Sequence, residues 1–516
     1  MCHINAIKTA SKTVDILTLT MILDVLLSTG GLTAILILLL ITLLWMDIRR
    51  PPDLPPGPPI YVPILGNLVG LNPETLLGKL KEYRKQYGDV FSLKMGSKWW
   101  IVLNGYDTIH AALVKNADVF SSRPDITIFR NIAKRKGIVA SSGKLWKEQR
   151  TFALTKLRDF GFGKRNFESN ILEEVEVLVK NLEEQKGNAF DIDDILYASI
   201  SNVTCSIVFG KRFSHTDPTF RKIVNMFSEN LRTANGAALA TWMPFLRFLP
   251  FDMFNIKKVI NNVDNIQKFL QTVIDDHWKT YDENNIRDFI DAFITEQKRR
   301  EDDANSTFTD FQLFRVVFEF FIAGTETTST TLRWAIIYLI RNPQIQEKMR
   351  KEIESVAGSS QFPRLQHRQD MPYTEAVLAE IQRCGDIVPL SLFHGVEQEV
   401  KFKGFRIPKE AVITPNLESV LLDPNDFTDP FTFNPERFLN QNGIFCHTEK
   451  MVAFSLGRRV CLGESLAKME LFLFLTAIVQ RFNLLPKEEN CPPSLEPIIG
   501  ATRSPKPFKF KAQPIC

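Results

Sequence analysis

The residues best suited to chemistry surround a cysteine near the end of the 516-residue chain, in Phe454-Ser-Leu-Gly-Arg-Arg-Val-Cys-Leu-Gly-Glu464. A helical pattern of apolar residues over 465–482 follows at once, so Cys461 is expected at or just before a helix N-terminus. Free backbone N–H groups and the positive end of the helix dipole favour a thiolate at that position. Gly457 and Gly463 carry no side chains, so a flat ligand could approach the backbone closely.

Arg459, two residues before the cysteine, is placed to meet an anionic group on such a ligand. Three other uses of Cys461 compete with this interpretation. A lone cysteine in an intracellular chain is more often a buried structural residue. A zinc site is disfavoured because Cys446 and His447 lie too far upstream for paired ligand spacing. A phosphate-binding loop is disfavoured because no Gly-Lys-Ser/Thr follows.

Five residues occupy fixed positions in one ten-residue window: Phe454, Gly457, Arg459, Cys461 and Gly463. This spacing resembles the haem-binding signature of the cytochromes P450, the haem-thiolate monooxygenases. The resemblance implies that Cys461 is the proximal ligand of the iron of haem b, where a thiolate favours O–O cleavage. It also implies that Arg459 contacts the haem.

Length and composition are consistent with one large globular unit. No Gly/Ser linker, low-complexity tract or repeat follows residue 60. The net charge of +4 is too small to indicate a nucleic-acid partner. The 40 phenylalanines suit a large apolar interior or pocket. The seven scattered cysteines suggest no disulfide framework and fit a reducing, cytosol-facing compartment.

The N-terminal region is expected to hold the protein to a membrane. Residues 25–46 form an apolar run of the roughly 20 residues that a bilayer-spanning helix needs. Trp45 suits the membrane interface, and Arg49 and Arg50 follow directly, which favours a cytosolic body. A cleaved signal peptide is disfavoured because its apolar region is shorter and closes on small residues.

A proline-rich stretch over 51–60 cannot be helix or inner strand and is expected to be a stiff, extended spacer. The expected organisation is therefore an anchor over 1–50, a hinge over 51–60 and one haem-thiolate monooxygenase domain over 61–516. By resemblance to microsomal, family-2-like members, the protein is expected in the endoplasmic reticulum membrane, with its first 60 residues outside the globular body.

Trp146 and Arg150 lie four residues apart on a helical stretch and so share one face. Alone, such a pair is common surface packing. Beside the cysteine signature it resembles the family's W-x-x-x-R, which implies that the indole N–H and the guanidinium bind a haem propionate. The resemblance assigns a propionate contact to His394 as well, although a satisfied core or surface histidine would look the same.

A long helical pattern over 309–342 must run through the core. Residues 323–331 in its middle include a glycine and many threonines, which are poor in a helix interior. One interpretation is a strained helix packed closely through Gly324. The other is a groove, opened by Ala323 and Gly324, in which Glu326 and Thr327 supply an acid and an alcohol. The second resembles the family's acid–threonine pair, which implies a proton relay.

Glu380 and Arg383 form an i,i+3 pair on another expected helix, and such a pair contributes little on a surface. With Arg437 downstream, it resembles the family's E-x-x-R plus arginine. The resemblance implies a buried, structural arrangement behind the cysteine loop.

Two shorter segments add to the expected fold. Residues 90–95 and 99–103 alternate around Gly96 and predict a small β-hairpin. Thr241 to Phe251 is apolar and holds two prolines. Two interpretations of this stretch have equal support. It is part of the core or, by resemblance, a loop that covers the pocket and touches the membrane. The fold implied is mainly α with small β-sheets, the cytochrome P450 fold, preceded by an N-terminal transmembrane helix.

The resemblance implies a pocket for a lipophilic substrate. The uncharged pocket candidates by family position are Ile138, Val139, Ala323, Leu390, Leu392, Phe393, Ile499 and Ala501. Burying each CH₂ of a ligand there is worth about 0.8 kcal/mol, so size and lipophilicity should dominate affinity. A fatty acid, a steroid-like compound or a xenobiotic is therefore the expected substrate.

The reaction implied is insertion of one atom of O₂ into such a substrate. Electrons would come from NADPH through the NADPH–cytochrome P450 reductase, with cytochrome b5 as a further partner. Basic residues that could form the docking face are Lys144, Lys147, Arg150, Arg158, Lys164 and Arg165. Two alternatives remain: a haem-thiolate isomerase or dehydratase, which the Glu326–Thr327 pair argues against, and a non-enzymatic, membrane-bound haem sensor or carrier.

Overall fold

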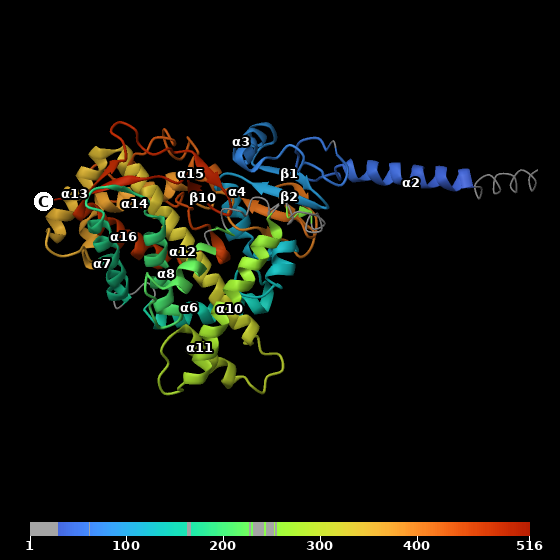
Figure 1. Ribbon diagram of the computed structural model, residues 1–516. Coiled ribbons are helices and arrows are strands. Elements are labelled where there is room, and N and C mark those ends of the chain that lie inside the picture. The colour runs from blue at the N-terminus through green and yellow to red at the C-terminus, as the bar shows by residue number, and fades with distance from the viewer. Residues whose placement is uncertain are drawn as a thin grey trace, which may run out of the picture.

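The computed structural model describes residues 29–60, 62–161, 167–226, 229–230, 242–243, 252 and 255–515. Helices make up most of the body, and α2 projects from it (Figure 1). The strands of this described part form four small sheets, in the orders β1-β2-β7-β4, β10-β9, β3-β11-β8 and β5-β6. The predicted fold class, mainly α with small β-sheets, is confirmed.

The α-helices among the described residues are α2 (Thr29–Ile48), α3 (Leu76–Tyr87), α4 (Tyr106–His110), α5 (Ala117–Phe120), α6 (Gly143–Asp159), α7 (Glu168–Glu184), α8 (Asp193–Val208), α10 (Ile256–Thr280), α11 (Phe289–Arg299), α12 (Asp310–Arg341), α13 (Pro343–Ala357), α14 (Pro372–Gly385), α15 (Glu418–Leu421) and α16 (Glu464–Arg481). Short 3₁₀ or π turns are η1 (Pro73–Thr75), η2 (Ala111–Lys115), η3 (Ile128–Ile132), η7 (Leu365–Asp370), η8 (Pro435–Phe438) and η9 (Gly457–Arg459). The strands are β1 (Val90–Met95), β2 (Lys98–Leu103), β3 (Ala189–Phe190), β4 (His394–Gly395), β5 (Val400–Phe402), β6 (Phe405–Ile407), β7 (Val412–Pro415), β8 (Phe482–Pro486), β9 (Pro497–Ile499), β10 (Arg503–Pro505) and β11 (Phe510–Pro514).

The largest sheet joins distant parts of the chain. Strands β1 and β2 pair antiparallel, and Gly96 turns between them at φ +58°, a conformation that favours glycine. The predicted hairpin is therefore confirmed. Strand β7 pairs parallel with β2 and antiparallel with β4. His394, the first residue of β4, is thereby placed in the same sheet as the hairpin.

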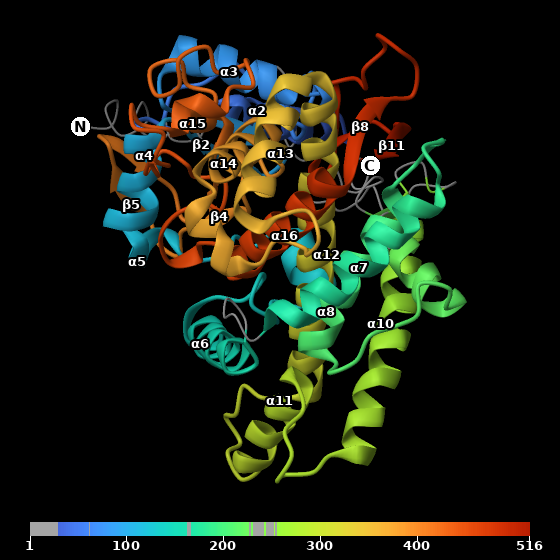
Figure 2. The ribbon, with the colours of Figure 1, turned by 90° about the vertical axis from the view of Figure 1, so that its left-hand side faces the viewer.

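Helix α12 organises the core. It is 32 residues long, and Figure 2 shows it running the length of the body. Its N-cap, Thr309, accepts a hydrogen bond from the N–H of Gln312 at 3.2 Å, which satisfies one of the free donors of the first turn. Helices α8, α14 and α16 pack against it within the main apolar cluster. The long helix predicted over 309–342 is confirmed.

Gly324 serves the packing of α12 against α8. A Cβ atom added at Gly324 would come within 2.5 Å of Thr204 Oγ1. The side chain of Thr204 packs directly on the backbone of Gly324, so a larger residue at this position would require Thr204 to shift. The interpretation of Gly324 as a packing residue therefore holds, and the expectation that it opens a groove is wrong.

The proline-rich segment packs on the body. Leu54 is 6% exposed and belongs to the core cluster beside the main sheet. The N–H of Ser92 donates to the Pro56 carbonyl at 2.7 Å, and the Arg50 guanidinium donates to the Pro55 carbonyl at 2.8 Å. The expectation that residues 51–60 lie outside the globular body is therefore wrong, because backbone carbonyls without a helix or sheet partner bind β1 and Arg50 instead.

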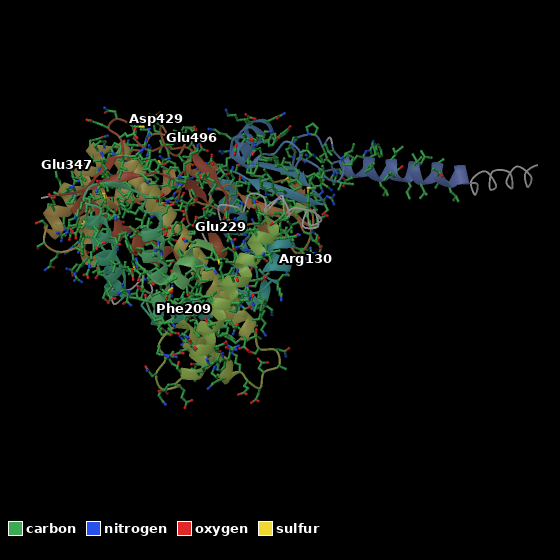
Figure 3. All side chains as sticks on the ribbon, viewed as in Figure 1. Arg130, Phe209, Glu229, Glu347, Asp429 and Glu496 are labelled. Atoms are coloured by element: carbon green, nitrogen blue, oxygen red, sulfur yellow. The ribbon has the colours of Figure 1, made fainter. Side chains whose placement is uncertain are left out.

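Helix α2 carries exposed aliphatic side chains, and Figure 3 shows them spreading from the helix on several sides. No helix among the described residues is long and apolar enough to cross a membrane. Residues 25–28 of the predicted anchor lie outside the described part of the chain. So does most of the stretch 241–251, in which only Trp242 and Met243 are described.

Candidate active site

The cysteine loop lies between η9 and α16. The N–H of Cys461 donates to the Phe454 carbonyl at 3.0 Å, which closes the loop on itself, and α16 begins at Glu464. Gly457 has φ +73°, and a Cβ atom there would overlap the carbonyl oxygen of Leu113 on η2. Gly457 is therefore required by close packing of the loop on the preceding part of the fold.

Cys461 is exposed to solvent, but the surrounding protein changes the pKa of its thiol. Desolvation raises the pKa of the Cys461 thiol, whereas hydrogen bonds from the N–H groups of Gly463 and Glu464 lower it and the Glu464 carboxylate raises it. The N–H groups at the helix start therefore favour the thiolate as predicted, but desolvation, which the sequence does not record, outweighs them. A coordinated metal cation deprotonates a thiol outright, so a thiolate here needs that extra positive charge.

Arg459 is buried against Trp146, whose ring centre lies 4.0 Å from the guanidinium carbon. Its three nitrogens donate to the carbonyls of Ser121, Ile138 and Ser141 at 2.8, 3.1 and 2.7 Å. Burial, together with repulsion from two neighbouring arginines, lowers the pKa of Arg459 to about 8. No carboxylate among the described residues is hydrogen-bonded to it.

Arg123, which sequence analysis missed, is one of those two arginines. It is 6% exposed, and it donates to the carbonyls of Val139 at 2.8 Å and Phe393 at 2.6 Å. Burial lowers the pKa of Arg123 to about 10, although the Glu319 carboxylate raises it. The only local signal is an arginine before a proline in an irregular segment, which carries no periodic pattern.

His394 lies beside the same two arginines. Its Nδ1–H donates to the Phe120 carbonyl at 2.6 Å. Burial, with repulsion from Arg123 and Arg459, lowers the pKa of His394 to about 3. The imidazole is therefore neutral at physiological pH, and it can offer a neutral hydrogen bond but no charge.

Trp146 and Arg150 both lie on α6, as predicted. Arg150 is half-buried and donates to the Val460 carbonyl at 2.6 Å, next to Cys461. Burial lowers its pKa. The indole Nε1 of Trp146 is buried and has no hydrogen-bond partner. A buried polar atom without a partner is costly, so an absent acceptor is expected at that position.

These observations test whether the residues fit haem b. Three guanidinium groups, a buried indole donor and a neutral imidazole gather beside a cysteine, and they hydrogen-bond chiefly to backbone carbonyls. The Glu319 carboxylate is the negative group that acts on Arg123 and Arg459, but no carboxylate among the described residues is hydrogen-bonded to any of the three guanidinium groups. Carboxylates are the partners that guanidinium groups bind best. A planar ligand with two propionates and a thiolate-binding metal supplies both missing features, so the residue set fits haem.

The middle of α12 places its acid and its alcohol in different surroundings. Thr327 is partly exposed, next to the exposed Ala323, and its hydroxyl donates to the Ala323 carbonyl at 2.7 Å. Glu326 is 5% exposed, and burial raises the pKa of its carboxyl group, although hydroxyl donors oppose that shift. Thr327 therefore offers an accessible hydroxyl, and Glu326 offers a buried acid that holds a proton nearer neutral pH.

Glu319, also missed by sequence analysis, fixes the segment that follows η3. Its Oε2 accepts hydrogen bonds from the N–H groups of Ile138 at 2.6 Å and Val139 at 3.0 Å. Gly137 has φ +77°, and a Cβ atom there would overlap the same carboxylate. A lone glutamate between phenylalanines at 318 and 320 was the available signal, since a charge in an apolar run needs a partner.

Behind the cysteine loop, Glu380 and Arg383 form a fully buried, two-bonded pair at 2.7 and 2.8 Å. Arg437 reaches the same carboxylate at 3.2 Å and donates to the Thr428 carbonyl at 2.8 Å. The remaining nitrogen of Arg383, Nη1, donates to the Leu421 carbonyl at 2.9 Å. The three predicted residues are thus brought together, and they tie α14 to the irregular segment before the cysteine loop.

The pocket candidates differ in exposure. Ile138 is buried, and the exposed candidates are Ala323, Leu392 and Ala501. The partly buried candidates are Val139, Leu390, Phe393 and Ile499. The Phe393 ring packs at 6.5 Å from that of Trp100 and at 5.7 Å from that of Trp242. Phe393 therefore belongs to an aromatic cluster beside β2, which limits its freedom to contact a substrate.

The predicted basic face is only partly formed on α6. Lys144, Lys147 and Arg158 are exposed at helical spacing. Arg150 is directed to Val460 instead, so it does not belong to this face. The two remaining basic residues, Lys164 and Arg165, lie outside the described residues.

Comparison with known proteins gives a consistent result. The family model for cytochrome P450 matches residues 55–512. The chain is 38% identical over 489 residues to cytochrome P450 2H1 of Gallus gallus, covering 94% of this chain and 99% of the relative. It is 39% identical to cytochrome P450 2B4 of Oryctolagus cuniculus, covering 86% and 93%. It is 40% identical to cytochrome P450 2C8 of Homo sapiens, covering 86% and 90%.

Proposed function

The chain belongs to the cytochrome P450 family and is a haem-thiolate monooxygenase, and on that premise we propose that Cys461 is the proximal ligand of its haem iron. Haem, when bound, supplies the iron at which O₂ is reduced, with electrons that come from NADPH through a reductase. The observation that carries the proposal is the cysteine beside a cluster of arginines that are hydrogen-bonded to backbone carbonyls and not to carboxylates.

The remaining haem contacts follow from charge. Arg123, Arg150 and Arg459 would bind the propionates with charge-assisted hydrogen bonds, and they exchange some of their present carbonyl partners to do so. Trp146 would donate its free indole N–H, and His394 would contribute a neutral hydrogen bond. The buried Glu380–Arg383–Arg437 cluster holds the segment behind the cysteine loop in place.

Protons would reach the reacting oxygen from α12. We propose that Glu326 stores the proton, because its carboxyl group is buried. We propose that the hydroxyl of Thr327 positions the group that donates this proton to the reacting oxygen, because the hydroxyl is accessible. Proton transfer by a positioned side chain typically contributes about 10²-fold or more to a rate.

Thr327→Ala is expected to keep haem and folded structure but to divert electrons from product to hydrogen peroxide. Product formed per NADPH should fall by about tenfold or more, because the positioned hydroxyl is lost. Thr155→Ala, an exposed threonine on α6, is the control and should keep normal coupling. If Thr327→Ala couples NADPH use to product as the parent does, the Thr327 hydroxyl has no role in proton transfer.

We propose a long-chain fatty acid, or a lipophilic compound of similar size, as substrate. The pocket candidates are uncharged, and affinity there should rise by about 0.8 kcal/mol for each CH₂ buried. Dissociation constants from spin-state titrations should therefore fall about threefold or fourfold per added CH₂ until the pocket is filled. Tighter binding and faster turnover of small polar compounds would contradict this substrate class.

We propose that the redox partner is the NADPH–cytochrome P450 reductase, with cytochrome b5 as a second partner. We also propose that the reductase docks on the exposed side chains of Lys144, Lys147 and Arg158. Exposed cations steer an acidic partner, so Lys147→Glu should slow electron delivery most at low salt. An unchanged rate at low salt would remove α6 from the docking face.

We also propose that residues 25–46 hold the protein in the endoplasmic reticulum membrane with the body in the cytosol, and that the boundary between anchor and body lies near residue 50. The support is the apolar sequence and the exposure of aliphatic side chains on α2, such as Leu36 at 64% and Leu38 at 63%. Protease added to intact microsomes should digest the body, whereas protection of the body would reverse the orientation.

A further inference from the structure

The carboxyl group of Glu326 sits among hydroxyl groups from three different elements. Tyr197 on α8 donates to Oε2 at 2.8 Å. Thr330 on α12 and Thr502, just before β10, each donate to Oε1 at 3.1 Å. Tyr197 is 4% exposed and Thr330 is fully buried, so neither of them meets solvent. Of the three, Thr502 also contacts a hydroxyl group that lies nearer the protein surface.

The hydroxyl of Thr502 lies 3.1 Å from that of Ser504. Both residues line a small surface recess, about 10 Å³ in volume, which is roughly the space of one water molecule. Ser504 is partly exposed. The other residues of the recess are Arg333, Ile498, Gly500, Pro505 and Pro507. A short chain of hydroxyl groups therefore leads from solvent to the buried carboxyl.

We propose that Ser504 and Thr502 form the entry by which protons from solvent reach Glu326. The proposal rests on the proposed role of Glu326 as proton store. When Glu326 has given up its proton, the Thr502 hydroxyl donates its own to Oε1 and accepts one from Ser504. Ser504 accepts one from water in the recess, so each hydroxyl loses and gains one proton, and solvent supplies the net proton.

The neighbouring groups leave the relay to the hydroxyls of Thr502 and Ser504. Burial raises the pKa of Tyr197 above its usual range, so this phenol keeps its proton and serves as a fixed donor. Arg333 lines the recess and pairs with Asp193 at 2.6 Å, and its charge lowers the pKa of Glu326 against the larger, opposite effect of burial. Threonine and serine hydroxyls can donate and accept at once, which is what a relay between water and a carboxyl requires.

The test measures hydrogen–deuterium exchange of the Glu326 carboxyl in the holoenzyme by infrared difference spectroscopy. Glu326→Gln identifies the carbonyl band, which must be separated from that of Glu470, another buried carboxyl whose pKa is raised to about 8. After transfer to D₂O, Thr502→Val is expected to slow the shift of the Glu326 band by about tenfold or more, and Ser504→Ala by less.

Thr330→Val is the matched control, because it removes a hydroxyl at the same distance from the same carboxyl oxygen but not on the way to the recess. It should move the band while leaving the exchange rate within about twofold of the parent. Equal exchange rates in Thr502→Val and the parent would overturn the proposal. So would the absence of a Glu326-dependent band, because the carboxyl would then hold no proton.

Turnover separates this entry from the function on which it rests. If Glu326→Gln uncouples NADPH use from product while Thr502→Val exchanges normally, the proton store stands and the entry is wrong. If Glu326→Gln leaves coupling unchanged, the store itself is wrong, whatever the exchange rates show.

Discussion

Cys461→His is expected to abolish the red-shifted Soret band that a thiolate ligand gives to the reduced, CO-bound haem protein, and to reduce monooxygenation to background. A thiolate donates electron density to iron that a neutral imidazole does not. The rest of the site remains, since Arg123, Arg150, Arg459 and Trp146 do not depend on the sulfur for their positions. Haem content measured beside the spectrum should therefore fall less than activity.

Cys491→Ser is the matched control, because Cys491 is also an exposed, free cysteine but lies in the loop between β8 and β9. It should keep the thiolate-type band and full activity. Survival of that band in Cys461→His would show that another cysteine binds the iron.

Glu380→Gln is expected to destabilise the protein by about 3–5 kcal/mol, the usual cost of removing one partner from a buried ion pair. The substitution keeps the shape of the side chain but leaves two guanidinium groups, Arg383 and Arg437, without their carboxylate. A typical protein is stable by only about 5–15 kcal/mol, so a large share of the total is lost. Urea denaturation of the holoenzyme measures the change.

Glu436→Gln provides the comparison. Glu436 belongs to η8 and pairs with Lys348 at 2.5 Å, but both side chains are 53% exposed. Solvent screens such a pair, so its loss should cost no more than about 1 kcal/mol. If both variants unfold at the same urea concentration, the buried cluster does not hold the cysteine segment as argued.

Much of the fold could be predicted because long periodic patterns leave few alternatives. The helix over 309–342 is set by its apolar period and its caps, and the hairpin around Gly96 by alternation and a turn residue. The comparisons confirm the family and the reaction class, and they favour a monooxygenase over an isomerase or a haem carrier. The roles assigned to individual site residues stay predictions.

The remaining features depend on tertiary contacts that no local pattern records. Arg123 acquires its role from carbonyls of residues 139 and 393, which only the folded chain brings together. Gly324 looks like a groove residue until α8 is seen against it. The thiolate expected at Cys461 followed from the helix start, whereas burial, which the sequence does not record, acts in the opposite direction and prevails.

The central claim is that this protein inserts one atom of O₂ into a lipophilic substrate. The direct measurement supplies ¹⁸O₂ to the full-length holoenzyme with reductase, NADPH and a long-chain fatty acid, and determines the isotope in the product by mass spectrometry. The account predicts a hydroxylated product that carries one ¹⁸O atom, formed only when NADPH is present. A product whose new oxygen comes from water, or one formed equally well without NADPH and O₂, would contradict it.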